Sequence, residues 1–311
     1  MWFPVLALLG QAAALTVSGT APPWTSGATF RQASPGAALA DLVAGRSDAA
    51  LTSLPAGPTP AGAGRLLSIP VGVYAVTVAY NLPGVNLRLD LPALCGLLGG
   101  DLRTWNDLLL ARLNPGSALP ALPVLPSSLT NPNAASLSVA RACVGAGLWP
   151  QDRLKSTWSA GAVYLRPTLD FLQNDLTRPG ALAVFAPGTL PRGVQVATLR
   201  TVGGPFAPPT PMLGLTPPVE MQTGSLPIGP SAPLPPADQP GAYPLRGLVW
   251  AVVFQDQAYQ GRSVQDARDL LAWLERLRAS SDQNFAAIPL VFRQPIHLYY
   301  NGTPLREASG P

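Results

Sequence analysis

The chain has 311 residues, of which 47% are hydrophobic and only 12% are charged, and its net charge is +4. That length allows one large domain or two lobes with separate cores. The longest apolar runs are much shorter than the ~20 residues of a membrane-spanning helix, so the composition is not that of a membrane-embedded protein. No run rich in Lys and Arg accompanies the positive charge, which gives nucleic-acid binding little support.

The first fourteen residues, MWFPVLALLGQAAA, resemble the apolar core of a secretory signal that ends in small residues. No Lys or Arg precedes this run. We expect an exported protein, periplasmic or in the cell envelope, and the alternative is a buried first strand. Cys95 and Cys143 leave two alternatives open: they pair after export, or they are free thiols in the core.

In the first part of the chain, strand patterns alternate with a helix. Residues 15–20 and 28–36 predict strands that end in turns, residues 37–44 predict a helix stopped by Gly45, and residues 48–54 predict another strand. This order is typical of a parallel α/β sheet. The run VGVYAVTVAY, residues 71–80, is the clearest strand signal of this half.

The middle of the chain alternates helices and strands in the same way. The predicted helices are 89–100, 104–115, 134–145 and an amphipathic helix within 166–180, and the predicted strands are 121–126, 181–187 and 194–200. Residues 203–243 are too rich in proline for a helix or a central strand. This Pro-rich tract is either a solvated spacer or a stiff surface for a partner protein.

The last part predicts a strand over residues 243–254 and the most regular helix of the chain over 263–281. Late strands are expected over 288–292 and 296–300. The only histidine, His297, falls in the last of these and is interpreted as a packed strand residue. No metal-ligand spacing, P-loop, dinucleotide fingerprint or nucleophile–histidine set is present, so we expect no enzyme, no cofactor and no metal.

Several segments, in order, resemble the phosphate-binding proteins of ABC transporters. They are ASPGAALADLVAGRSDAALTSLPAG (33–57), VGVYAVTVAYNLPGV (71–85), TWND (104–107), TRPGALAVFAPGTLPRGVQVATLRT (177–201) and AYPLRGLVWAVVFQDQ (242–257). The resemblance implies an α/β, two-lobe periplasmic-binding-protein-like fold (type II) with an interlobe cleft and two hinge crossings, near 79–82 and 243–247. Residues 1–14 are then a signal peptide, 15–79 plus 245–300 lobe I, and 80–244 lobe II. The expected partners are phosphate or a similar oxyanion, and an ABC permease at the membrane.

The family holds phosphate with loop hydroxyls, N–H groups at helix starts, one arginine, and one aspartate that accepts the proton of hydrogen phosphate. Matching positions in this chain give a candidate site made only of neutral residues. Ser53 stands at the position of the aspartate, and PSSLTNPN (126–133) replaces the loop that carries the arginine. The expected ligand-binding residues are Thr20, Ser34, Gly36, Thr52, Ser53, Ser127, Ser128, Thr130 and Asn133.

Two departures weaken the expected phosphate site. The position of the arginine falls near Pro126 or Ser127, so a bidentate contact to the oxyanion is lost. Pro35 removes one N–H from the start of the first helix. Two functions therefore stand side by side: a binding protein for phosphate or a related oxyanion that relies on hydrogen bonds, or a degenerate scaffold that acts as an envelope-associated interaction protein. Arg31, Arg141 and Arg246 are the arginines to locate in the structure.

Overall fold

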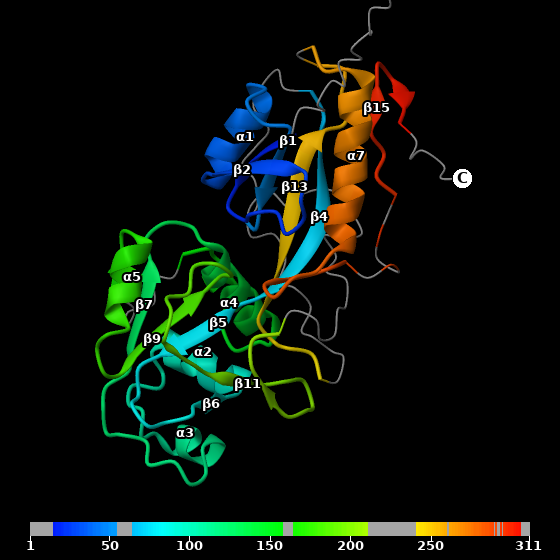
Figure 1. Ribbon diagram of the computed structural model, residues 1–311. Coiled ribbons are helices and arrows are strands. Elements are labelled where there is room, and N and C mark those ends of the chain that lie inside the picture. The colour runs from blue at the N-terminus through cyan, green and yellow to red at the C-terminus, as the bar shows by residue number, and fades with distance from the viewer. Residues whose placement is uncertain are drawn as a thin grey trace, which may run out of the picture.

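The computed structural model describes residues 15–54, 64–157, 164–210, 241–259, 261–288, 290, 293 and 295–305. They form two α/β lobes joined at a narrow waist (Figure 1). We call the part around the six-stranded sheet lobe I and the part around the five-stranded sheet lobe II. The expected signal peptide, residues 1–14, and most of the Pro-rich tract, residues 211–240, lie outside the described residues.

Lobe I is built on a sheet with the strand order β14-β4-β13-β3-β1-β2. Its strands are β1 (Leu15–Gly19), β2 (Ala28–Gln32), β3 (Ala49–Thr52), β4 (Leu66–Ala75), β13 (Arg246–Phe254) and β14 (Phe285–Ala286). The predicted parallel arrangement is confirmed for β1, β2 and β3. β13 is antiparallel to both β3 and β4, so the whole sheet is mixed.

Two helices cover opposite faces of this sheet. Successive residues on a strand point to alternate faces, so the strand residues that each helix contacts identify its face. Helix α1 (Pro35–Val43) packs its leucines against Ala50 and Val252. Helix α7 (Val264–Ala279) belongs to the larger core cluster that contains Leu51 and Val253, the neighbours of those two residues. A capping box between Ser263 and Asp266 begins α7, as the sequence SVQD favours.

Lobe II has a five-stranded sheet with the order β10-β5-β9-β7-β8 and a small sheet with the order β12-β11-β6. The strands are β5 (Thr77–Tyr80), β6 (Arg88–Leu89), β7 (Leu125–Leu129), β8 (Tyr164–Arg166), β9 (Ala181–Phe185), β10 (Gln195–Val196), β11 (Thr198–Arg200) and β12 (Phe206–Ala207). The helices are α2 (Leu91–Gly99), α3 (Leu108–Leu113), α4 (Ala134–Gly145), the short 3₁₀ helix η1 (Gln151–Arg153) and α5 (Leu169–Asp175). The prediction of α4 is confirmed at both of its ends.

The strand expected over 121–126 is wrong in position. Leu125 and Ser127 pair with Ala181 and Ala183 of β9, so the strand is β7 and includes both serines of the PSSL segment. Pro120 and Pro123 have no N–H to donate to a ladder and lie before β7, which begins at Leu125.

The chain crosses between the lobes at two places. The predicted strand over 71–80 is divided at Val76: β4 belongs to lobe I, whereas β5 pairs with β9 in lobe II. This crossing lies N-terminal to the expected residues 79–82, because Ala79 and Tyr80 already pair with β9. The chain returns just before β13, where Val76 N–H donates to Leu245 O at 2.9 Å. The lobe boundaries given above stay a prediction.

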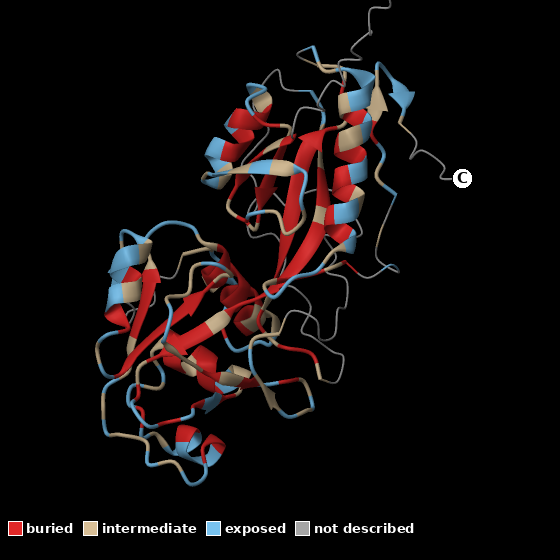
Figure 2. Cartoon of the chain, viewed as in Figure 1, coloured by how far each residue is buried: buried red, intermediate tan, exposed pale blue. Residues whose placement is uncertain are grey.

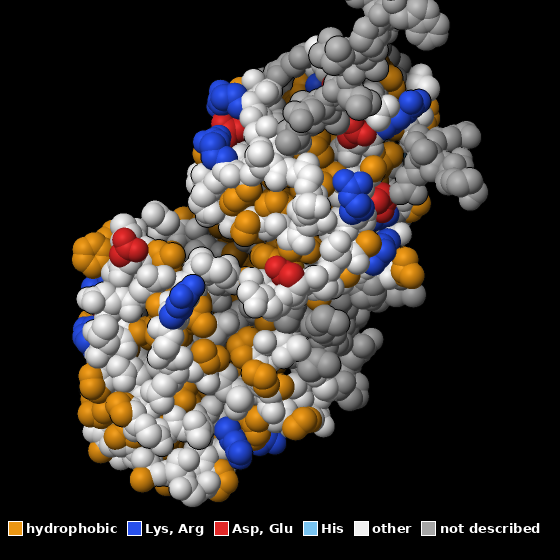
Figure 3. All heavy atoms as spheres, in the orientation of Figure 1, with side chains coloured by type: hydrophobic (Ala, Val, Ile, Leu, Met, Phe, Trp, Pro, Cys, Tyr) orange, Lys and Arg blue, Asp and Glu red, His pale blue; other side chains and the backbone are white. Residues whose placement is uncertain are grey.

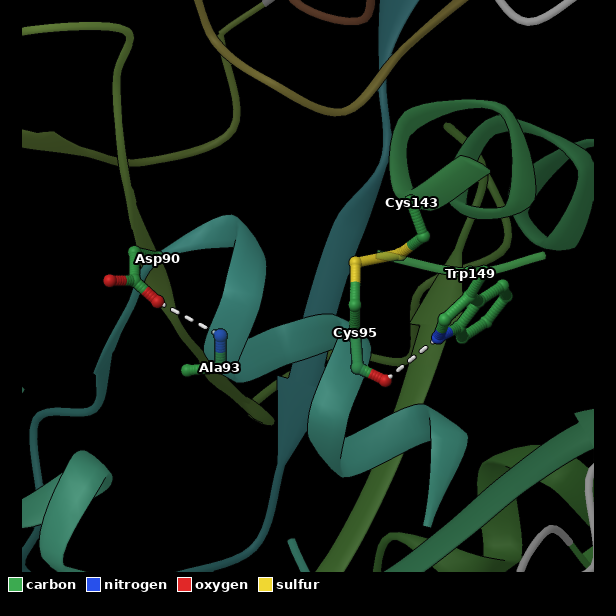
Figure 4. Close-up of a disulfide and its surroundings, with 5 residues drawn as sticks. All are labelled: Asp90, Ala93, Cys95, Cys143 and Trp149. Atoms are coloured by element: carbon green, nitrogen blue, oxygen red, sulfur yellow. Dashed lines mark hydrogen bonds between the residues drawn. A yellow bond between two sulfur atoms is a disulfide. The ribbon is translucent and has the colours of Figure 1, made fainter. Parts of the chain in front are cut away.

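Helix α4 lies at the junction of the lobes, and almost all of its residues are buried (Figure 2). A disulfide joins its Cys143 to Cys95 of α2, with the two Cα atoms 5.9 Å apart (Figure 4). The structure thus decides between the two cysteine alternatives in favour of pairing. Trp149 packs beside the bridge and donates from Nε1 to Cys95 O at 3.1 Å, while Asp90 caps the start of α2 through Ala93 N–H.

The C-terminal part departs from the predicted strands. Phe285 and Ala286, rather than residues 288–292, form the edge strand β14, and Ile288 lies outside any strand. The hairpin β15 (Tyr299–Tyr300) and β16 (Thr303–Pro304) follows. His297 is exposed and precedes β15, so its interpretation as a packed strand residue is wrong. Over the described residues, no helix combines the length and the apolar character needed to cross a membrane.

Candidate functional site

A cavity of about 430 Å³ lies between the two lobes. Lobe I contributes the residues that follow β1, β2 and β3, and lobe II contributes the ends of β7 and β9, the start of α4 and one side of α5. In lobe I and in lobe II these are the carboxyl ends of parallel strands. Open α/β sheets bind their ligands at such ends, so the topology alone marks this cavity as the candidate site.

Two hydroxyls of lobe I lie together at the cavity. Thr20 Oγ1 is 3.2 Å from Ser53 Oγ, and it also accepts a hydrogen bond from Ser53 N–H at 3.1 Å. They meet because β1 and β3 are paired neighbours and each ends one residue before its hydroxyl. Both residues line the cavity, as the sequence predicted.

The start of α1 contributes one hydroxyl and little else. Ser34 lines the cavity and accepts from Ala37 N–H at 3.4 Å as the N-cap. Pro35 also lines the cavity but has no N–H. Gly36 is exposed and is not among the described lining residues.

The start of α4 provides the stronger polar element, from lobe II. Asn133 caps the helix by accepting from Ser136 N–H at 2.8 Å, and Ser128 Oγ is 3.0 Å from Ser136 Oγ. Ala134 and Ala135 line the cavity, and their N–H groups donate to no acceptor within the described part of the chain. These groups, with the positive end of the helix dipole, favour an anion at this wall.

Four of the predicted ligand residues do not line the cavity. Because β7 alternates, Ser128 faces α4 while Ser127 faces Asp175 on α5. Thr130 is exposed and bonds to Arg166 O, and Gly36 lies on the outer side of α1. The hydroxyl of Thr52 donates to Leu54 O at 2.8 Å and is buried. The structure thus brings together Thr20, Ser34, Ser53, Ser128 and Asn133.

Among the described lining residues, none is Asp, Glu, Lys or Arg. Arg31 forms an ion pair with Asp41 beside α1. Arg141 is buried in the body of α4, and Arg246 begins β13. None of these three arginines is among the described residues of the cavity wall. In Figure 3 the charged side chains on the visible face are few, and most of the surface is uncharged.

Tyr74 links the two lobes, a role that the sequence did not indicate. It belongs to β4, and its hydroxyl is 3.3 Å from Ser138 Oγ and 3.5 Å from Ala134 O, both on α4. Burial raises the pKa of Tyr74 against the smaller opposite effects of Ser138, Arg141 and Ser53, so the side chain is a neutral hydroxyl. The Tyr74 ring fits in this position because its register partner on β13 is Gly247, which has no side chain to collide with the ring.

Residues 6–275 match the family model of a PBP superfamily domain, and the chain belongs to this superfamily. The superfamily and its fold are those of solute-binding proteins. The structure is similar to PfluDING, a high affinity periplasmic phosphate-binding protein bound with phosphate, with 14% identity, a TM-score of 0.63 and coverage of 89% of this chain and 91% of that one.

Two further solved structures share the fold. One is a phosphate-binding protein from Stenotrophomonas maltophilia, with 17% identity, a TM-score of 0.56 and coverage of 87% and 85%. The other is a human phosphate binding apolipoprotein, with 13% identity, a TM-score of 0.58 and coverage of 89% and 92%. At these identities the likeness defines the two-lobe fold with its interlobe cleft, which confirms the predicted fold class.

Proposed function

We propose that the protein is an extracytoplasmic solute-binding protein that holds phosphate or a related oxyanion in the cavity between its lobes. The observation that carries this proposal is the meeting of the N–H groups at the start of α4 with hydroxyls from both lobes in one cavity. Thr20, Ser34, Ser53 and Ser128 would donate to the oxyanion, and Ala134 and Ala135 would donate through the backbone. The phosphate-binding proteins with the same fold support phosphate as the first ligand to test.

The neutral wall sets the expected strength and selectivity of binding. A bidentate arginine contact is among the strongest that an oxyanion receives in a protein, and none of the described lining residues supplies one. None of the described residues that line the cavity is a carboxylate, which would reject an anion that lacks a proton. We therefore expect micromolar or weaker binding, with phosphate and sulfate within about tenfold of each other.

Isothermal titration of the full chain with phosphate, sulfate and arsenate tests this function. Saturable heat with similar affinities for the three anions is the expected result. An absence of heat for all three, at protein concentrations that reveal micromolar binding, would overturn oxyanion binding.

A pair of neighbouring serines provides matched variants for the same titration. Ser128→Ala removes the hydroxyl of a residue that lines the cavity, and the loss of one hydrogen bond to a charged group predicts that the affinity falls by about tenfold or more. Ser127→Ala removes the same group from the next residue of β7, which faces Asp175. Equal effects of the two substitutions would contradict the proposed position of the ligand.

One observation favours the alternative function, a scaffold that no longer binds phosphate. The cavity has no described charged residue, and six large apolar side chains reach it: Leu54, Leu129, Leu169, Leu172, Val184 and Phe185. On this alternative the protein acts as an envelope-associated interaction protein, and the three anions above produce no heat.

Export and docking on an ABC permease complete the proposal. The Cys95–Cys143 disulfide supports an oxidising compartment, since such bridges are rare in the cytosol. Fractionation of the native host, with thiol labelling before and after reduction, tests export: the expected chain is extracytoplasmic and labels only after reduction. A cytosolic chain with labelled cysteines would contradict export.

A further inference from the structure

The interlobe cavity is larger than an inorganic oxyanion requires. Its 430 Å³ corresponds to the volume of about fourteen water molecules, whereas phosphate or sulfate replaces only a few. Pockets of this size usually enclose organic ligands. With the lobes placed as they are in the structure, the volume in excess of the anion holds water or another part of the ligand, and the chemistry of the walls decides which.

The polar and apolar walls of the cavity belong to different sides of lobe II. Ser128 and the first residues of α4 form the polar side. Leu129, Leu169, Leu172 and Phe185 form the apolar side, and all of them belong to one hydrophobic cluster between α5 and the sheet. The alternation of β7 produces this separation, because Ser128 faces α4 and Leu129 packs toward α5.

Lobe I also contributes both polar and apolar side chains to the cavity. Ser53 lies beside Thr20, and Leu54 follows it at the same cavity. An ordered water needs two to four polar partners, which an apolar wall does not offer. A ligand that places an oxyanion at the start of α4 and an apolar group against α5 would satisfy both walls.

We infer that the preferred ligand is an organic oxyanion of the phosphonate or phosphate-monoester class, with a small uncharged apolar substituent. This inference rests on the proposed function, because it assumes that the oxyanion binds at the start of α4. The substituent lies between Leu129 and Leu169 on one side and Leu54 on the other, where it displaces water from apolar surface.

Isothermal titration with inorganic phosphate, methylphosphonate, propylphosphonate and the neutral alcohol propanol tests the inference. We expect affinity to rise about fourfold for each added methylene, because each is buried against the apolar wall. Propanol should not bind measurably, since it lacks the charge that the helix start favours. Phosphate binding equal to or tighter than propylphosphonate binding overturns the inference and leaves the proposed function intact. Heat from none of the anions overturns both.

Variants separate the two walls. Leu129→Ala and Leu169→Ala, at partly buried positions, should each weaken propylphosphonate about threefold or more and leave inorganic phosphate unchanged. Ser128→Ala should weaken every anion of the series. Leu108→Ala, on α3 where the side chain is 76% exposed, is the matched control and should change neither ligand. Equal losses for phosphate and propylphosphonate in the leucine variants would contradict an apolar subsite.

Discussion

The sequence resemblance predicts that Ser53 stands where phosphate-binding proteins carry the aspartate that accepts a hydrogen bond from hydrogen phosphate. Its hydroxyl lies 3.2 Å from Thr20 Oγ1, at the cavity. We expect Ser53→Asp to create selectivity: the new carboxylate repels sulfate and accepts the proton of hydrogen phosphate, so the phosphate-to-sulfate preference rises about tenfold or more. Titration with both anions at neutral pH measures this preference.

The neutral variant Ser53→Asn is the control for the change in size. It should leave the phosphate-to-sulfate ratio near that of the unaltered protein. If Ser53→Asp and Ser53→Asn shift the ratio equally, the charge is not the cause and the oxyanion does not approach residue 53.

Asp175 is a buried carboxylate that holds α5 against the edge of the sheet. It receives two hydrogen bonds from Arg166, at 2.6 and 2.9 Å, and pairs with Arg178 at 3.0 Å. Burial by itself would raise the pKa of Asp175, but Arg166, Ser127 and Arg178 together lower it below the ordinary 3.8. The native state therefore binds this proton less readily than the unfolded chain does.

The stability contributed by Asp175 is present above pH 3.8 and is lost as the pH falls through the lowered native pKa. Asp175→Asn should lower the free energy of unfolding by about 3 kcal/mol at neutral pH, because two arginines lose their partner. Urea unfolding at several pH values checks both statements. The loss on acidification should be smaller in Asp175→Asn than in the control Asp101→Asn, at an exposed position. Identical acid profiles for the two variants would contradict the role of Asp175.

At the residue scale, the sequence predicted that the site is polar and uncharged better than it predicted which residues form the site. Thr20 and Ser53 are predicted from the resemblance to phosphate-binding proteins, and both lie at the cavity because each directly follows a strand, β1 or β3, that ends there. The prediction of Ser127 as a ligand residue treats the PSSL segment as a loop. Once the strand extends through it, only one of two adjacent serines can face the cavity. Tyr74 was missed because its contact with Ser138 joins positions 64 residues apart.

Among the elements, α4 combines the polar wall of the site with a covalent link to α2. The disulfide closes a loop of 48 residues, which predicts a stabilisation of about 4 kcal/mol through restriction of the unfolded chain. We expect the double variant Cys95→Ser/Cys143→Ser to unfold at lower urea concentration, with a loss of about 3 to 4 kcal/mol.

Reduction supplies the matched control for that variant. A reductant should lower the stability of the unaltered protein to nearly that of the double variant and leave the variant itself unchanged. Equal stability of the two proteins under oxidising conditions would contradict a stabilising bridge.

Elements with a strong local signal were predicted well, and those set by distant pairing were not. Helix α4 has a capping asparagine and a C-terminal glycine, and both of its ends were found. The run over 71–80 has continuous strand character, so nothing local reveals that Val76 separates two sheets. The edge strand β14 exists only through its pairing with β4, and its own two residues carry no strand pattern.

For the whole molecule, Gly247 controls how closely the lobes meet. A Cβ at this position would lie 2.1 Å from Tyr74 Cζ and 2.2 Å from its hydroxyl oxygen. We expect Gly247→Ala to displace the ring, to break the contact with Ser138 of the other lobe, and to lower stability by about 1–3 kcal/mol. Small-angle X-ray scattering should show a larger radius of gyration than that of the unaltered protein.

Gly36→Ala is the control for Gly247→Ala, because a Cβ at residue 36 meets no atom within 4 Å. A glycine-to-alanine change within a helix should maintain or raise stability, and the radius of gyration should not change. If Gly247→Ala is as stable and as compact as Gly36→Ala, Tyr74 does not set the junction of the lobes.

The place of β13 in the six-stranded sheet determines when lobe I can fold during synthesis of the chain. β13 separates β3 from β4 in the sheet, although about 170 residues of the chain lie between β4 and β13. On a ribosome, β1 to β4 emerge long before the strand that joins them, so lobe I cannot close until residue 254 has been synthesised. Throughout that interval β3 and β4 lack the strand that pairs with both of them, so the sheet of lobe I stays divided until the end of β13 has emerged.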